Sequence, residues 1–517
     1  MNFSALNWAI VGTYFLITMA MGFWLTRKIH SADDFFSAGR SMPWWAVGLS
    51  ILATYVSALS LLGGPAWSYT EGLGVALIHI NYPLVVLIVI TVFLPYFYAS
   101  KIPSIYAYVG ERFGGAARTL MAAIFLITQW LTTGAVLYAT ALVGSFITGV
   151  PVELAIVVIS LAALAYSLLG GIAAVIWTDV LQSIILFVGA GIAAYTLVNS
   201  LDMPFSDMLN TLKSADKLNT FSFSFDIERV DTVWSGVVAM TLYHVTVYGA
   251  SQMMVQRALT TPSLNDAKKA FMLMGYGAFF IYLFFLSMGL GLFIFYNGAS
   301  FENGNTILLE FIASQAPSWV MGIIAATVLA ASMSSVDSAL NSLATITYLD
   351  FYERMRKTKA PIPANKSLII TRWFTVCWGV LIILPALSFS TGKGSVLEML
   401  SQVGSYFVGA KLAIFMLGFF SRNTTQNGLL VGVAAGFAAV LLTALFSDVA
   451  WPWFAVIGGV ATMLVARLVS IFTAPQAYNP ALCLRTSSVP ISINVASIGL
   501  LAALGVNLLI MYLLTTI

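Results

Sequence analysis

The chain has 517 residues, of which 60% are hydrophobic and only 8% are charged. Ordinary soluble proteins carry about 25% charged residues, so this composition excludes a string of soluble domains. The net charge of +3 is too small to indicate a nucleic-acid-binding protein. Two cysteines, Cys377 and Cys483, support neither a disulfide framework nor a zinc site. We therefore expect an all-α membrane protein.

Apolar segments long enough to cross a bilayer follow one another along the whole chain. A spanning helix needs about 20 mainly apolar residues, and glycine, proline and charge clusters divide the sequence into about fourteen such segments. The predicted spans are 6–26, 43–69, 76–100, 119–148, 153–170, 172–198, 231–255, 270–296, 317–349, 368–389, 397–420, 427–446, 451–472 and 491–514.

Lysine and arginine are distributed unequally between the alternate loops that join these spans. Eighteen of the 23, including Arg257, fall in one set of loops, four fall in the other, and Lys411 falls within a span. Cytoplasmic loops carry the excess of basic residues. The sequence therefore predicts a multi-pass protein of the cell (inner or plasma) membrane, with both termini outside and a long outer loop over about 199–230.

Two predicted spans contain features that interrupt helices. The span 43–69 contains Gly63-Gly64-Pro65, which should disrupt its hydrogen bonds. The span 231–255 is polar around His244 and contains Gly249. Interrupted helices at matching positions of two halves are typical of transporter substrate sites. Ordinary kinks packed within the protein would give the same pattern.

The span 317–349 contains a polar face. Its small residues recur at positions i, i+3, i+4 and i+7, which places them on one side of a helix: Ala331, Ser334, Ser335 and Ser338. Hard cations prefer oxygen ligands, and hydroxyl groups on this face can supply them. Close helix packing also favours small residues. Packing does not explain Asp337, because a charge at the centre of a span costs about 2.5 to 3.5 kcal/mol.

Four further polar side chains fall within predicted spans. Asp179 is either a second functional carboxylate or a helix-start residue bonded to backbone amides. Lys411 could extend its ammonium group toward the interface, pair with Asp337, or attract an anionic substrate. His79 and His244 are either hydrogen-bonded packing residues or substrate contacts.

Several of these segments resemble the sodium/solute symporter family, and the resemblance extends from about residue 6 to the end of the chain. The segments that carry it are Asp33–Phe36 with Gly39–Trp45, Gly170–Gln182, Gln252–Arg257, Ser334–Ser342 and Gly418–Gly428. The resemblance implies a LeuT-type core of two inverted five-helix repeats, at about 43–198 and 231–420, and sodium-driven alternating access. The peripheral helices would then be about 6–26, 427–446, 451–472 and 491–514.

The resemblance also implies ion sites. The positions that match the shared sodium site are Ala53, Val56, Ala331, Ser334 and Ser335. A second sodium site, present in some members, matches Asp179, Ser334, position 337 and Ser338. This chain has Asp337 where those members carry serine. The carboxylate could therefore strengthen a sodium site or convert it to a proton site, and proton-coupled symport remains an alternative.

Substrate recognition differs from both bacterial patterns that the resemblance offers. Positions that line the bacterial sugar site match Ser60, His79, His244, Gly277 and Ser401, and the sugar carriers' polar residues are absent. The arginine that holds carboxylate in sialate carriers matches Thr132. Together with Lys411, the histidines form a set that can be cationic, so we expect a small organic anion, with a sugar or polyol as the alternative.

The expected partners are a small solute, the sodium ion as coupling ion, and membrane lipid, with no nucleic acid and no obligate protein partner. A transporter-like sensor and a channel are the rival functions. An enzyme is not expected, because no nucleophile–base constellation stands out.

Overall fold

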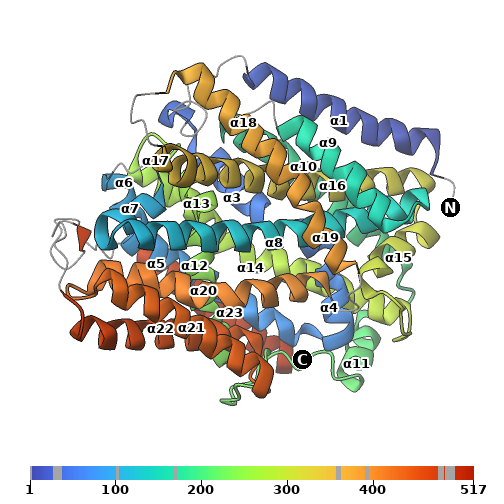
Figure 1. Ribbon diagram of the computed structural model, residues 1–517. Coiled ribbons are helices and arrows are strands. Elements are labelled where there is room, and N and C mark those ends of the chain that lie inside the picture. Colours follow the sequence, from blue (N-terminus) through green and yellow to red (C-terminus); the bar gives the residue numbers. More distant parts are fainter. Residues whose placement is uncertain are drawn as a thin grey trace.

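The computed structural model describes residues 3–26, 38–100, 104–167, 172–356, 362–390, 395–474, 482–483 and 495–516. All regular elements in these ranges are helices, and Figure 1 shows the longest of them lying side by side. The family segments Asp33–Phe36 and Gly170-Gly171 lie outside the described residues, as do several loop cations that predicted the orientation, Lys393 among them.

The first half of the chain forms α1 (Ala5–Thr26), α3 (Trp44–Tyr55), α4 (Gly64–Glu71), α5 (Tyr82–Ile88), α6 (Leu94–Ser100), α7 (Ile105–Phe113), α8 (Gly115–Thr148), α9 (Val152–Ser167), α10 (Ile172–Ser200), α11 (Phe205–Ser214), α12 (Met240–Gly249) and α13 (Gln252–Ala258). The second half forms α14 (Leu264–Phe295), α15 (Ile307–Gln315), α16 (Ser318–Ile346), α17 (Glu353–Met355), α18 (Ala364–Leu381), α19 (Ile383–Phe389), α20 (Val396–Phe420), α21 (Gln426–Phe446), α22 (Phe454–Ile471) and α23 (Val495–Thr516).

Within the described ranges, eleven helices are long and apolar enough to cross a membrane, or twelve if a bent pair is counted as one span. Each of the fourteen predicted segments contains helix. However, α9 is shorter than a full span, and the segment 231–255 is divided between α12, α13 and a π-helical turn at Ser235–Ala239. The count of fourteen is therefore not confirmed.

The first broken span bends by 54° between Trp44–Tyr55 and Leu59–Glu71. α3 ends at Tyr55, Val56 is extended (φ −83°, ψ 91°), and a π-helical turn resumes at Leu59. The prediction that Gly63-Gly64-Pro65 breaks this helix is wrong. The helix continues from Leu59 to Glu71 through these residues, and its π-helical turn changes to α4 at Gly64, one residue before Pro65.

The second broken span is interrupted where the sequence predicted. α12 ends at Gly249, Ala250 and Ser251 leave the helix, and α13 begins at Gln252. Its backbone is buried in protein, which is where non-helical backbone is tolerated at membrane depth.

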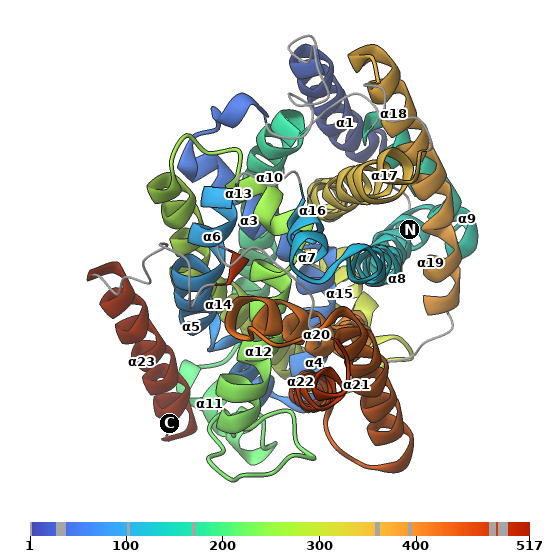
Figure 2. The ribbon, with the colours of Figure 1, turned by 60° about the vertical axis from the view of Figure 1, so that its left-hand side comes forward.

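Long helices surround both breaks. α14 packs against α3 and α4, α16 packs against α8 and α10, and α12 packs against α20. Figure 2 shows α1, α18, α21 and α23 at the periphery. The exposure of the spans agrees, since 17% of the α23 window is buried against 83% for Ser318–Met355.

The predicted outer loop is folded onto the ends of the helices. It contains α11, and after it the Lys217 carbonyl oxygen accepts a 2.9 Å hydrogen bond from the backbone N–H of Leu73. Gly72 has φ +82°, and an added Cβ would lie 2.9 Å from that same carbonyl oxygen. Further along, Thr220 donates to the Met511 carbonyl of α23 at 2.6 Å. The loop thus joins the first broken span to the last helix.

Candidate functional site

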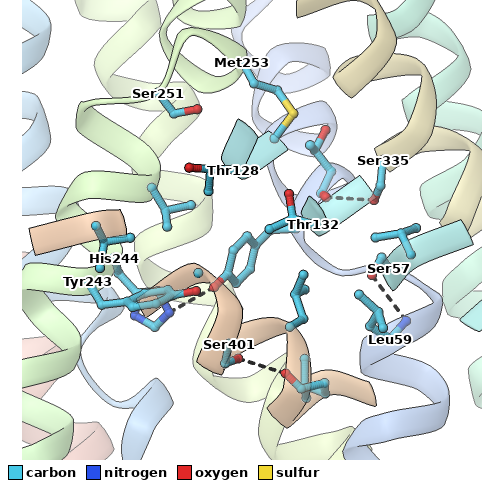
Figure 3. Close-up of a pocket in the computed structure, with 18 of the residues that line it drawn as sticks. Ser57, Leu59, Thr128, Thr132, Tyr243, His244, Ser251, Met253, Ser335 and Ser401 are labelled. Atoms are coloured by element: carbon cyan, nitrogen blue, oxygen red, sulfur yellow. Dashed lines mark hydrogen bonds between the residues drawn. The ribbon is translucent and has the colours of Figure 1, made fainter. Parts of the chain in front are cut away.

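Both helix breaks open on one cavity of about 130 Å³. Figure 3 shows residues of α12, α8, α20 and α16 around a common space, with His244 and Tyr243 on one wall and Ser335 on another. The polar lining residues are Thr54, Tyr55, Ser57, His79, Thr128, Gln129, Thr132, Thr133, Tyr243, His244, Ser251, Tyr282, Ser335, Ser401 and Lys411.

Oxygen atoms of α16 meet the last turn of α3 beside this cavity. Ser334 Oγ donates to the Ala53 carbonyl at 2.8 Å and lies 3.3 Å from the Ala331 carbonyl oxygen. Ser335 Oγ donates to the Thr54 carbonyl at 2.9 Å. The sequence placed these residues far apart, and the fold brings two hydroxyl groups and three carbonyl groups together.

The chemistry of this set suits a hard monovalent cation. Val56 is extended, so its carbonyl leaves the helical ladder two residues after Thr54. Neutral carbonyl and hydroxyl oxygens are ligands for such ions, and α16 lies buried against the break. The five predicted positions therefore lie on two adjacent segments, and Thr54 is an additional oxygen that the sequence did not predict.

A buried ion pair lies beside the serine face. Arg257 and Asp179 are 1% and 0% exposed, and Arg257 Nη2 lies 3.3 Å from Asp179 Oδ2. Ser50 Oγ donates to the same oxygen at 2.5 Å and accepts from Arg257 Nε at 2.8 Å. Arg257 also donates to Ser338 Oγ and, at 2.7 Å, to the Met253 carbonyl. Asp179 Oδ1 has no hydrogen-bond partner among the described residues.

This arrangement corrects the expectation for Arg257 and decides between the two alternatives for Asp179. Arg257 is not a cytoplasmic loop cation, because it lies within α13 and is bonded to four residues. Asp179 is not a helix-start residue, because it lies seven positions inside α10 and is held by side chains. In the sequence, an arginine near the end of an apolar run looks like the edge of a span. The burial of Arg257 depends on distant elements that the sequence does not show.

Asp337 adds a second negative charge to this region. It is 2% exposed and interacts electrostatically with both Arg257 and Tyr14. Ser338, the next residue, donates to the Ser334 carbonyl at 2.5 Å while it accepts from Arg257. The three buried ionisable groups Asp179, Asp337 and Arg257 would carry a net charge of −1 when all are ionised.

A series of hydrogen bonds between polar residues leads from the interior to this cavity. Asn81 Nδ2 donates to the Gly236 carbonyl at 3.0 Å, and Asn81 Oδ1 lies 3.0 Å from His244 Nδ1. His244 Nε2 lies 3.1 Å from Tyr55 Oη. His244 and Asn81 are fully buried, whereas Tyr55 is half-buried at the cavity.

His79 faces the same cavity from the 3₁₀ segment Leu73–His79. Its ring stacks on Tyr282 with centroids 3.7 Å apart, and its Nδ1 lies 3.2 Å from Tyr82 Oη. His79 Nε2 has no hydrogen-bond partner among the described residues. Ser60, which the sequence placed at the site, does not line the cavity. Its hydroxyl donates to Tyr282 Oη at 3.3 Å, so Ser60 contacts a residue that lines the cavity and not the cavity itself.

Lys411 and Ser401 reach the cavity from α20. Lys411 is 5% exposed and makes no hydrogen bond or ion pair with any residue that the structure describes. The expected alternative, an ion pair with Asp337, is therefore wrong, as is full extension to the interface. Ser401 Oγ donates to the Leu397 carbonyl of its own helix at 2.9 Å, and its oxygen retains acceptor capacity.

Sequence reasoning missed Tyr55, Tyr282, Asn81 and Ser50. Aromatic residues in apolar spans look like packing, and only the fold shows that Tyr55 bonds to a residue 189 positions away. Asn81 gave a weak signal as an amide within a predicted span.

The comparisons with known proteins agree with this architecture. A model of the sodium:solute symporter family matches residues 35–436. The sodium/sialic acid symporter of Aliivibrio fischeri is 30% identical over 487 residues, which cover 92% of this chain and 94% of that protein. A solved Na+-coupled sialic acid symporter, in a substrate-bound outward-open state, has a TM-score of 0.83 at 26% identity and covers 92% of this chain and 100% of its own.

A more distant structure shares the fold. A nucleobase-cation-symport-1 family transporter in a closed conformation has a TM-score of 0.57 at 12% identity, with 91% of this chain and 98% of that chain covered. Both solved structures support the LeuT-type fold. The family model and the sialic acid symporters support sodium as the coupling ion and a transporter, not an enzyme. The chain belongs to the sodium:solute symporter family and is a sodium-coupled secondary active transporter.

Proposed function

We propose that this symporter imports a small organic anion. The observation that carries the proposal is Lys411, whose ammonium group is buried at the solute cavity with no partner among the described residues. A buried cation without a counter-charge is costly, and an anionic solute would neutralise it. Two of the similar proteins named above are symporters of sialic acid, which is a carboxylic acid. This chain has Thr132 where the resemblance places the carboxylate-binding arginine, so the positive charge comes from α20 instead.

The test is sodium-driven uptake into proteoliposomes by wild type and Lys411→Met. Methionine keeps the length and apolar body of the side chain while removing the charge. We expect the KM for a carboxylate to rise by about tenfold or more, the equivalent of one charge-assisted hydrogen bond. Unchanged affinity for the anion, or uptake of a neutral polyol with no binding of carboxylates, would overturn the anion assignment.

We propose that sodium binds at Ala53, Val56, Ala331, Ser334 and Ser335. Ser334 and Ser335 contact the carbonyls at the break directly, so sodium there would join α16 to the last turn of α3. The double variant Ser334→Ala with Ser335→Ala should lose sodium-dependent uptake and remain folded. Ser332→Ala is the matched control, because this hydroxyl bonds only within α16, to the Val328 carbonyl at 2.8 Å.

We further propose that Asp179, Asp337 and Ser338 form a second cation site. The support is the net negative charge of the buried group that Arg257 only partly neutralises. Replacing sodium by choline at fixed pH separates the two candidate ions. Uptake that survives in choline with a proton gradient would assign this site to a proton.

The domain arrangement and the location of the protein are proposals of the same kind. The two inverted repeats would be 43–198 and 231–420, with peripheral helices at 6–26, 427–446, 451–472 and 491–514. Removing the two buried helical residues Arg257 and Arg112 from the loop cations leaves sixteen against four, which still favours a cytoplasmic position for that set and outer termini in the cell membrane. In a variant without Cys377 and Cys483, a membrane-impermeant maleimide should label Ser4→Cys from outside intact cells.

A further inference from the structure

Resting on the proposed anion transport, we propose that the solute also carries a hydroxyl group and that Tyr55 recognises that hydroxyl as a hydrogen-bond acceptor. The solute class is then a small hydroxycarboxylate. The proposal depends on the direction of the hydrogen bonds that lead from Gly236 through Asn81 and His244 to Tyr55.

The direction of these hydrogen bonds is fixed at their buried end, next to Gly236. The Gly236 carbonyl can only accept, so the amide nitrogen of Asn81, 3.0 Å away, must face it. The amide oxygen of Asn81 therefore faces His244 Nδ1 at 3.0 Å. Since this oxygen can only accept, Nδ1 must carry a hydrogen atom.

The same logic sets the next bond. His244 is 0% exposed, forms no ion pair with a described carboxylate, and lies 6.2 Å from the ring of His79, so a neutral imidazole is favoured. A neutral ring with hydrogen on Nδ1 has a lone pair on Nε2. Tyr55 Oη, 3.1 Å from Nε2, must then donate its hydrogen to His244.

Tyr55, whose hydroxyl also neighbours that of Tyr82, keeps a lone pair to offer to the cavity. Its hydrogen is committed to His244, and its ring lines the cavity at the end of α3. A solute hydroxyl can donate to this oxygen, whereas a keto group or a methylene group cannot. A site built for one hydrogen bond discriminates against an analogue that lacks it.

Small matched acids test the two polar groups that would hold the solute. Lys411 provides the charge on α20, and Tyr55 provides the acceptor on α3. Lactate, pyruvate and propionate are matched probes, because they share three carbons and a carboxylate and differ at one position.

The experiment measures the KM of each acid in sodium-driven uptake by proteoliposomes. In wild type, we expect lactate to have a KM about tenfold below those of pyruvate and propionate, the equivalent of one hydrogen bond. Tyr55→Phe should remove this preference. Tyr98→Phe is the matched control, because its hydroxyl donates to the Thr261 carbonyl at 2.9 Å outside the cavity, and it should keep the preference.

His244→Leu tests the direction of the hydrogen bond between Tyr55 and His244. Without Nε2 as an acceptor, Tyr55 can donate its hydrogen to the solute, so the preference should shift toward pyruvate. A purely structural role for His244 would change uptake of the three acids together. If His244→Leu does not fold, Tyr55→Phe alone decides the question.

The outcomes separate this inference from the proposed function. Equal KM values for the three acids in wild type, with Lys411→Met still raising all of them, would overturn the hydroxyl recognition and leave anion transport standing. No sodium-driven uptake of any of the three, or indifference to Lys411→Met, would overturn the anion proposal and this inference with it.

Discussion

Arg257→Met is expected to destabilise the protein more than any exposed arginine substitution. Arg257 is 1% exposed and loses its ion pair with Asp179, together with hydrogen bonds to Ser50, Ser338 and the Met253 carbonyl. Removing one partner of a buried pair costs about 3 to 5 kcal/mol, because the other charge stays buried. That is a factor of about 100 to several thousand in the ratio of folded to unfolded protein.

An exposed pair provides the control. Arg229 Nη2 lies 2.6 Å from Asp231 Oδ2, closer than the buried pair, but the two side chains are 44% and 29% exposed. Exposed pairs contribute about 0 to 1 kcal/mol. Arg229→Met should therefore leave thermal stability almost unchanged, even though the distance is shorter.

The assay is thermal unfolding of purified protein in detergent, with a double-mutant cycle. Arg257→Met should lower the Tm strongly. Adding Asp179→Asn should recover much of the loss, because it removes the carboxylate charge that Arg257→Met leaves buried without its partner. Arg257→Lys should fall between, since lysine keeps the charge but cannot bond to Ser50, Asp179 and Ser338 from one planar group. A Tm for Arg257→Met equal to that of Arg229→Met, or additive effects in the cycle, would refute the reasoning.

Two further predictions concern the second cation site and the outer loop. Asp337→Asn removes one buried negative charge, so the sodium concentration that half-saturates uptake should rise by about tenfold or more, and an unchanged value would show that Asp337 does not act on the ion. Gly72→Ala should destabilise by about 1 to 3 kcal/mol, because Gly72 has φ +82° and an added Cβ meets Lys217 at 2.9 Å. Gly277→Ala, within α14 and with nothing within 4 Å of the added Cβ, should be neutral or slightly stabilising in the same thermal unfolding assay.

Much of the fold could be predicted because it depends on local properties. Apolar length located the spans, and polar residues in apolar surroundings located Ser334, Asp337, His244 and Lys411. The break after α12 coincides with Gly249, a residue that signals it. Sequence reasoning placed the other break at Gly63-Gly64-Pro65, but Val56 and Ser57 carry it, and neither residue type favours a break by itself.

The remaining errors concern pairings between distant segments. Asp179 and Arg257 are 78 positions apart, and Tyr55 and His244 are 189 positions apart. A charge count treats every cation at the edge of an apolar run alike, so Arg257 was assigned to a loop. Only the packing of α3, α10, α13 and α16 shows which polar groups satisfy one another.

The serine bonds at the proposed sodium site have a consequence for release of the ion. Ser334 and Ser335 donate to the carbonyls of Ala53 and Thr54, so these oxygens have partners of their own. A sodium ion that used the same lone pairs would displace those donors on entry, and the hydroxyl groups could return to them when it leaves. Such a site exchanges one set of satisfied contacts for another, which lowers affinity and also lowers the barrier to departure. A carrier that must discharge its ion in every cycle benefits from rapid unloading more than from tight retention.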